Sequence, residues 1–319
     1  MSFSNKVATV FGGTGFLGCQ VVRALARRGV IVKVATRTPA SAYFLRPNGT
    51  VGQVVPYYCD YNDESSIARA VAGSDYVVNC IGILAEKRKG DFERIHAQLP
   101  ASIARACTQA RVRRFVHISA LGVQTGTSQY SKTKRAGEDA LRKIFPAATI
   151  MRPSIIFGEG DNFFNMFASL ARILPFLPLI GGGKTKFQPV YVGDVASAVI
   201  SALEQSRQQA KGETYELGGL ETLTFKEIYQ RMFAFTGTPR RLVKLPWAIA
   251  KLQASLMAIL PSPLLTPDQV ESLKTDSVVE MGAKGLHDLA VQPTTLDLIL
   301  PRYLTRFREG GRFAEIKPV

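Results

Sequence analysis

Residues 7–18, which read Val-Ala-Thr-Val-Phe-Gly-Gly-Thr-Gly-Phe-Leu-Gly, decide the fold of this chain. An apolar, β-branched run opens directly into glycines, which is the pattern of a strand, a tight turn and a helix. Gly12 permits the turn, Gly15 lets the backbone approach a pyrophosphate, and Gly18 lets the helix pack closely on the strand. The segment predicts a dinucleotide-binding βα unit whose pyrophosphate lies on the free N–H groups of a helix that begins near Phe16.

The residues that flank this loop agree with that prediction. Leu17, Val21 and Leu25 fall on one helical face, and Gly29 is a natural helix end before the next strand. We therefore expect the whole loop to contact the cofactor: Gly12, Gly13, Thr14, Gly15, Phe16, Leu17 and Gly18.

Strands and helices alternate through the first half of the chain, which predicts an α/β fold with a Rossmann-type, doubly wound parallel sheet. The expected strands are Val7–Phe11, Val30–Thr36, Gly52–Tyr58, Tyr76–Ile81, Arg114–Ser119 and Thr149–Ile156. The expected helices lie near residues 16–28, 63–72, 91–110 and 129–144. We expect residues 1–157 to form the NAD(P)-binding domain and residues 158–319 a smaller, mixed α/β C-terminal region that completes the cleft.

The second half is less regular. Phe163–Leu174 is predicted to be helical, Asp194 to cap a helix that runs to about residue 204, and Thr214–Leu217 to form a strand. Thr224 and Glu227 have the spacing of a capping box at a helix start.

Charge and cysteine content narrow the function classes. A net charge of +15 over 319 residues suits an anionic nucleotide, a nucleic acid, an anionic membrane or an acidic partner. Basic runs are short, as at residues 87–89 and 111–114, so no nucleic-acid partner is expected. The four widely spaced cysteines show no CxxC and no zinc-ligand pattern, which predicts reduced thiols in a reducing compartment and no metal site.

The chain shows no apolar run of about 18 residues, so no transmembrane segment is expected. The first strand begins almost at once, and we expect no signal or transit peptide. We therefore expect the chain to be cytosolic or to lie on the inner face of a membrane.

The residues that follow the second and third strands bear on the cofactor. Thr36-Arg37 has no nearby Asp or Glu, and an arginine there accommodates the 2′-phosphate of NADP, so NADPH is expected over NAD. Asp60 is placed either to bind the adenine amino group or to cap the next turn. Gly82, after the fourth strand, would let the cofactor pass close to the backbone.

Tyr130 and Lys134 are four residues apart on a predicted helix, so their side chains share a face. Nearby positive charge lowers the pKa of a tyrosine, which is what a phenolic proton donor or acceptor needs. Together with Ser119, at the end of the fifth strand, they are the candidate catalytic residues if the chain is active.

These features resemble an extended or atypical short-chain dehydrogenase/reductase. The resemblance rests on the glycine loop, Asp60, the Tyr130/Lys134 pair and Arg152-Pro153-Ser154. It implies that Tyr130 and Lys134 flank the nicotinamide ribose and that Pro153 packs near the nicotinamide.

Further stretches resemble one branch of that family, the NADPH-binding accessory subunits of respiratory complex I (NADH:ubiquinone oxidoreductase) in their mitochondrial and alphaproteobacterial forms. They are residues 116–120, 130–138, 152–158, 188–195 and 292–296. The resemblance implies structurally held NADPH, contact with peripheral-arm subunits, and a peripheral place on the cytoplasmic face of a bacterial inner membrane or on the matrix side.

Two departures from active reductases favour a cofactor that turns over slowly or not at all. Ser119 is followed by Ala120, Leu121 and Gly122 instead of the usual serine cluster, and His96 stands where an asparagine often orders the lysine. The leading hypothesis is a non-catalytic accessory or assembly subunit. The alternatives are a soluble NADP-dependent oxidoreductase or epimerase of a small or isoprenoid substrate, and a redox sensor that binds a partner according to cofactor state.

The apolar stretch Leu245–Leu264 has two interpretations. It is either a buried helix of the C-terminal region or a helix that lies on an anionic membrane or partner surface, anchored by Trp247. The flanking cations fit the second interpretation: Arg240, Arg241, Lys244 and Lys251.

Overall fold

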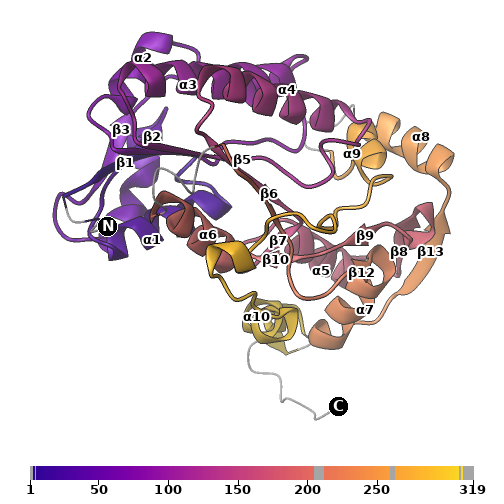
Figure 1. The fold of residues 1–319 in the computed structure, drawn as a ribbon. Coiled ribbons are helices and arrows are strands. Elements are labelled where there is room, and N and C mark those ends of the chain that lie inside the picture. Colours follow the sequence, from indigo (N-terminus) through magenta and orange to yellow (C-terminus); the bar gives the residue numbers. More distant parts are fainter. Residues whose placement is uncertain (1–2, 4, 205–211, 259–262, 309, 312–319) are drawn as a thin grey trace. The chain divides into compact units, whose positions relative to one another are not determined.

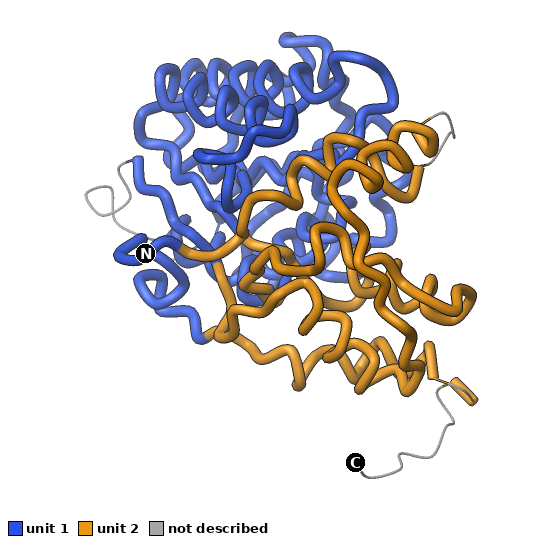
Figure 2. The backbone as a smooth tube through the Cα atoms, turned by 90° about the vertical axis from the view of Figure 1, so that its right-hand side faces the viewer, with its two compact units in different colours: residues 1–153, 192–217, 280–292 blue, residues 154–191, 218–279, 293–319 orange. Residues whose placement is uncertain are grey.

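The computed structural model describes residues 3, 5–204, 212–258, 263–308 and 310–311 (Figure 1). Contacts divide the chain into two compact units, coloured separately in Figure 2. Unit 1 comprises residues 1–153, 192–217 and 280–292, and unit 2 comprises residues 154–191, 218–279 and 293–319.

Within the described residues, unit 1 contains a parallel sheet of seven strands in the order β11-β6-β5-β4-β1-β2-β3. The strands are β1 (Val7–Phe11), β2 (Ile31–Thr36), β3 (Val54–Tyr58), β4 (Tyr76–Asn79), β5 (Arg114–Ile118), β6 (Thr149–Pro153) and β11 (Thr214–Leu217). The strand order reverses between β1 and β4, and ligands of such sheets bind beyond the carboxyl ends of the strands at that point. The predicted Rossmann-type fold is confirmed.

Helices cover both faces of this sheet (Figure 1). One face carries α2 (Glu64–Val71), α3 (Leu99–Gln109) and α4 (Gln129–Ile144), and the other carries α1 (Phe16–Arg27), which packs on α6 (Val192–Glu204). A π-helical turn, Glu93–Gln98, leads into α3, and 3-10 turns span Pro39–Asn48 and His287–Leu289. The central strands β4 and β5 are buried on both faces, as parallel strands between two layers of helices are.

Three details differ from the sequence-based expectations. β6 ends at Pro153, and Ile156–Phe157 forms a separate strand, β7, in unit 2. The predicted strand Thr214–Leu217 pairs with β6 as the edge of the unit 1 sheet, so unit 1 ends before residue 157 and regains later segments. Asp194 lies in the first turn of its helix and not at the N-cap position, because α6 begins two residues earlier.

Unit 2 is built from short strand pairs and helices. Its paired strands are β7 with β10 (Val190–Tyr191), β8 (Phe176–Ile180) with β13 (Arg241–Leu245), and β9 (Lys186–Phe187) with β12 (Leu223–Thr224). Its helices are α5 (Phe163–Ile173), α7 (Phe225–Thr236), α8 (Trp247–Met257), α9 (Pro267–Ser272) and α10 (Leu296–Leu304), with 3-10 turns at Gly181–Gly183 and Thr305–Phe307.

The core of unit 2 is aromatic, with Phe164, Phe225 and Tyr229 almost wholly buried. The capping box predicted at Thr224 and Glu227 is confirmed: the hydroxyl accepts from the Glu227 N–H, and the carboxylate accepts from the Thr224 N–H. None of the helices in the described residues is long and apolar enough to cross a membrane.

Candidate cofactor site

The glycine loop between β1 and α1 leaves no room for side chains. Gly12 has φ +73°, and a Cβ there would lie 3.0 Å from the Cys80 carbonyl carbon. A Cβ on Gly18 would lie 2.0 Å from the Gly12 oxygen. The Gly15 N–H donates to that same oxygen at 3.0 Å, which closes the turn. The loop therefore has the close backbone approach that the sequence predicts.

Helix α1 begins directly after this loop, and no side chain caps its N-terminus in the described residues. Gly15 occupies the N-cap position, and no side chain in the described residues binds the first helical N–H groups. A helix N-terminus attracts anions through its unsatisfied N–H groups and its dipole. The arrangement fits a pyrophosphate, whose oxygens would supply the missing acceptors.

Arg37 and Asp60 follow the neighbouring strands β2 and β3. The exposed Arg37 guanidinium lies 5.7 Å from the ring centre of Tyr61, and no carboxylate of the described residues pairs with it. One Asp60 oxygen, Oδ1, accepts from the Asn62 N–H at 2.9 Å. Asp60 therefore caps its turn, which was one of the two roles predicted for it. Its second oxygen, Oδ2, forms no hydrogen bond in the described residues.

Lys134 on α4 is buried at the carboxyl end of β5. Its Nζ donates to the Ile118 carbonyl oxygen at 3.0 Å, and a Cβ on Gly82 would lie 3.4 Å from that Nζ. Burial lowers the pKa of Lys134 to about 8, against an opposing effect of Glu138. The structure thus brings together the ends of β4 and β5 and the helix that carries the Tyr130/Lys134 pair.

Tyr130 stands edge-on to His96, with the ring centres 5.2 Å apart. Burial raises the pKa of Tyr130 to about 12. The expectation that Lys134 lowers this pKa is therefore wrong for the protein by itself, because desolvation of the phenolate dominates.

His96 has a structural partner on each side of its ring. Its Nε2 accepts from the Ile83 N–H at 3.1 Å, so Nδ1 carries the proton and faces the Thr133 hydroxyl at 3.3 Å. Burial, with a smaller effect of Lys134, lowers the pKa of His96 to about 3. His96 is therefore neutral near pH 7 and ties the segment after β4 to α4.

Two buried polar atoms near the end of β5 have no hydrogen-bond partner in the described residues: His117 Nε2 and Ser119 Oγ. Asn79 Oδ1 accepts from the Ile81 N–H, so its amide nitrogen donates to His117 Nδ1 at 3.1 Å and leaves the ring proton on Nε2. Such orphaned groups are costly unless water or a ligand satisfies them. Together with the loop, they show that the residues present fit a dinucleotide.

Pro153, which was also predicted to contact the cofactor, is buried at the carboxyl end of β6, opposite Leu217 of β11. No cluster of three or more His, Cys, Asp or Glu side chains in the described residues could hold a metal ion.

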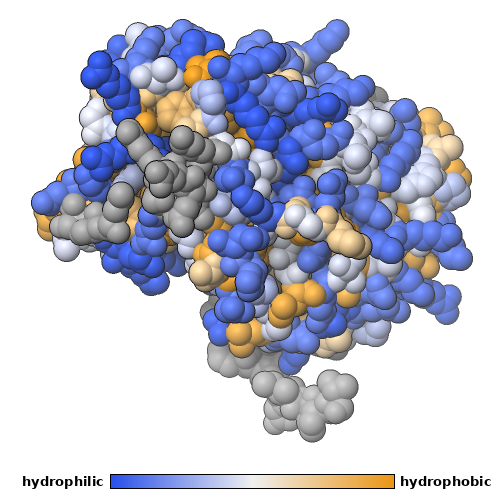
Figure 3. Space-filling model, in the orientation of Figure 1, coloured by the Kyte–Doolittle hydropathy of each residue, from blue (hydrophilic) through white to orange (hydrophobic). Residues whose placement is uncertain are grey.

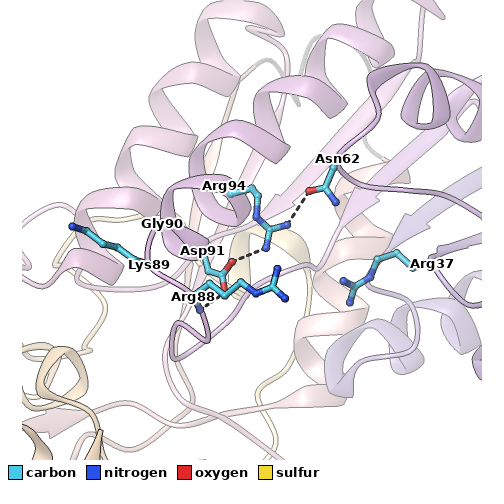
Figure 4. Close-up of a pocket in the computed structure, with 7 residues that line it drawn as sticks. All are labelled: Arg37, Asn62, Arg88, Lys89, Gly90, Asp91 and Arg94. Carbon is cyan, nitrogen blue, oxygen red and sulfur yellow. Dashed lines mark hydrogen bonds and ion pairs between the residues drawn. The ribbon is translucent and has the colours of Figure 1, made fainter. Parts of the chain in front are cut away.

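A cationic cavity of about 420 Å³ beyond β2 and β3 was not predicted (Figure 4). Its lining residues are Arg37, Asn62, Arg88, Lys89, Gly90, Asp91 and Arg94. Only Arg37 was singled out from the sequence. The Lys-Arg-Lys run at residues 87–89 is the signal in the sequence that could have indicated Arg88 and Lys89.

Comparison with known proteins agrees with this geometry. Residues 8–218 match the NAD dependent epimerase/dehydratase family, which supports a nicotinamide dinucleotide as the ligand class. The chain is 38% identical over 322 residues to NADH dehydrogenase (ubiquinone) 1 alpha subcomplex subunit 9 of Arabidopsis thaliana, covering 97% of this chain and 80% of the relative. The subunit of the same name from Mus musculus is 37% identical over 325 residues, covering 99% of this chain and 85% of the relative.

Among solved structures, the NADPH-dependent quinone oxidoreductase QOR2 of Escherichia coli, complexed with NADPH, superposes with a TM-score of 0.73. The match covers 94% of this chain and 99% of that one at 18% identity, which shows a shared fold. The family match and the near full-length relatives lead to one conclusion. This chain belongs to the NAD dependent epimerase/dehydratase family and, within it, to the family of the alpha subcomplex subunit 9 of NADH dehydrogenase (ubiquinone).

Proposed function

We propose that this chain is an accessory subunit of respiratory complex I that holds NADPH structurally. The observation that carries the proposal is the similarity to subunits of that enzyme along 97–99% of the chain. A soluble reductase or epimerase is not favoured, because it would not account for relatives of this kind over both units. The place that follows is the peripheral arm, on the cytoplasmic face of a bacterial membrane or the mitochondrial matrix side.

Each part of the cofactor has residues that would hold it. The Gly12–Gly18 loop and the N-terminus of α1 would bind the pyrophosphate, Arg37 the 2′-phosphate, and the second oxygen of Asp60 the adenine amino group. Tyr130, Lys134, Gly82 and Pro153 would lie along the nicotinamide ribose and ring. NADPH supplies a hydride when it is bound.

The residues of the chain favour binding of the cofactor without its oxidation in a catalytic cycle. Ser119 is buried, and the next three residues supply no hydroxyl to polarise a substrate. A Tyr130 with a pKa near 12 is a weak proton donor near pH 7. These features together support slow or absent turnover.

We propose further that α8 and its neighbourhood rest on an anionic membrane surface. The hypothesis of a buried helix does not fit, because only Ala250 and Ala254 are buried in α8, whereas Leu252 and Leu256 are 63% and 64% exposed. Trp247 itself packs on Gly181 and is half-buried. We therefore assign the apolar contact with the membrane to Leu252 and Leu256 and not to Trp247. Residues 259–262 of the stretch lie outside the described residues.

Figure 3 shows hydrophobic surface at the edge of the molecule where Figure 1 labels α8, and cationic residues flank this helix in the sequence. Arg241, Lys244 and Lys251 are exposed, with no ion pair in the described residues. Apolar contact combined with flanking positive charge is what binds an amphipathic helix to anionic lipid. The test is flotation with phosphatidylserine-containing vesicles: L252E/L256E should abolish binding, and L298E on α10 should not. Equal binding by all three proteins would refute the membrane contact.

The accessory role is tested by native purification of complex I from respiratory membranes. We expect the chain to co-purify stoichiometrically, with NADPH released on denaturation. Arg37→Asp should weaken NADPH binding by about 1.5–3 kcal/mol while sparing NADH. Absence of the chain from the purified complex would overturn the proposal, and steady turnover abolished by Tyr130→Phe would favour the reductase.

A further inference from the structure

The cationic cavity described above has a charge that its own residues do not neutralise. Arg94 donates to Asp91 Oδ1 at 2.7 Å and to Asn62 Oδ1 at 2.9 Å, so its charge is compensated. Arg37 and Arg88 form no ion pair in the described residues, and Lys89 lines the same cavity. Figure 4 shows Arg88 pointing toward Arg37 across the cavity. The site is therefore built for an anion.

The turn that carries Arg88 is held in place by two carboxylates. Glu86 Oε1 accepts from the N–H groups of Gly90 and Phe92, at 3.1 and 2.8 Å. Asp91 Oδ2 accepts from the N–H groups of Lys87 and Arg88, at 3.2 and 2.9 Å. Because these bonds order the backbone before any ligand arrives, binding by Arg88 costs side-chain entropy but little backbone entropy.

The position of the cavity identifies the chemistry of the anion. Arg37 follows β2, where this fold reads the ribose of the adenosine, whereas the pyrophosphate belongs at the N-terminus of α1. A planar guanidinium binds a phosphate monoester through two parallel hydrogen bonds, and two guanidiniums on opposite sides match a dianion. The volume of about 420 Å³ lies within the range of small-molecule sites, about 300–1,000 Å³.

We propose that Arg88 closes on the 2′-phosphate of the NADP adenosine from the side opposite Arg37, so that the turn after β4 determines cofactor specificity together with the residue after β2. Arg94, fixed by Asp91 and Asn62, positions the turn and does not itself need to touch the phosphate. This inference rests on the proposed NADPH binding and adds a second residue to it.

The experiment compares Arg88→Gln with Lys87→Gln in the full chain. Lys87 is exposed, neighbours Arg88 and does not line the cavity, so its loss controls for net charge. Dissociation constants are measured by calorimetry for NADPH and NADH, and for the fragments 2′,5′-ADP and 5′-AMP. R88Q should weaken NADPH and 2′,5′-ADP by about 10- to 100-fold and leave NADH and 5′-AMP within about threefold, whereas K87Q should leave all four within about threefold.

Several outcomes would overturn the inference. If Arg37→Asp discriminates between the cofactors but R88Q does not, the turn has no part in specificity and the NADPH proposal stands. If wild type binds neither nucleotide, or binds both equally, both proposals fail. If inorganic phosphate raises the melting temperature of wild type but not of R88Q, while NADPH affinity is unchanged, the cavity takes free phosphate instead. An Arg88→Lys variant, which keeps the charge without the planar fork, should fall between wild type and R88Q.

Discussion

His96 accepts a hydrogen bond from the backbone N–H of Ile83 at 3.1 Å, which joins the π-helical turn before α3 to the segment after β4. The π-helical turn has a local cause. In a regular helix the His96 carbonyl would accept from residue 100, but Pro100 has no N–H to donate. The released carbonyl lies against Gly137 of α4. One histidine therefore uses both its ring and its backbone to dock three elements beneath the candidate site.

The buried, neutral His96 makes stability sensitive to acid. Its pKa is about 3 in the folded protein against 6.5 in the unfolded chain, so between these values the unfolded state binds more protons and stability falls as pH falls. By pH 5 the loss attributable to His96 is about 2 kcal/mol. Urea unfolding at pH 7 and pH 5 should show a smaller difference for His96→Gln than for wild type. The exposed His287→Gln should keep the wild-type difference, and identical differences in all three proteins would refute the assignment.

Lys134 should make the stability of the protein depend on pH in the alkaline range. Its pKa is about 8 in the folded protein and 10.5 in the unfolded chain, so the unfolded state again binds more protons between these values and stability rises as pH rises. The gain across this window is about 3 kcal/mol. Lys134→Met should lack this gain, as measured by chemical unfolding between pH 7.5 and 10. Parallel curves for the two proteins would mean that the ammonium is not desolvated as the structure indicates.

Gly137 should tolerate no larger residue. A Cβ at this position would lie 1.8 Å from the His96 carbonyl oxygen, which is backbone and cannot move alone. Gly137→Ala should therefore lower the free energy of unfolding despite its better helix propensity, at the upper end of the range of about 1–3 kcal/mol for overpacking. The exposed Asp139→Ala in the same helix should change stability by less than about 0.5 kcal/mol. A stabilised Gly137→Ala would show that α4 does not approach His96 this closely.

The ion pair between Arg152 and Glu138 should be sensitive to loss of one partner. Arg152 binds both Glu138 oxygens, at 3.0 and 2.6 Å, and Glu138 is fully buried. Arg152→Met removes the ion-pair partner of that buried carboxylate, and breaking a buried pair in this way costs about 3–5 kcal/mol. Arg28→Met, which removes an exposed pair with Glu204, should cost no more than about 1 kcal/mol. Equal losses in thermal or urea unfolding would contradict this distinction.

The sequence predicted much of the fold because its signals are local. Residues 7–18 alone specify a strand, a turn and a helix, and six strands follow from β-branched runs bounded by turn residues. The place of β11 could not be predicted in this way. A strand of four residues carries no local indication of the sheet that it joins, and only its pairing with β6 decides that.

The candidate site was predictable where residue type and spacing suffice, as for Tyr130 and Lys134 on one face of α4. Arg88 was not, because its position depends on Glu86 and Asp91 binding backbone N–H groups of their own turn. The neutral state of His96 also depends on burial and on the Ile83 N–H, neither of which a single sequence displays.

The return of β11 to the first sheet has a consequence for biosynthesis. Domains generally fold as the nascent chain leaves the ribosome, N-terminal parts first. Here β6 emerges with an open edge that residues 214–217 cover in the folded sheet, and residues 154–191 of unit 2 are translated between them. An uncovered strand edge is a site of aberrant pairing. The nucleotide-binding unit therefore stays immature through much of translation, and its vulnerable period on the ribosome is set by the inserted residues 154–191.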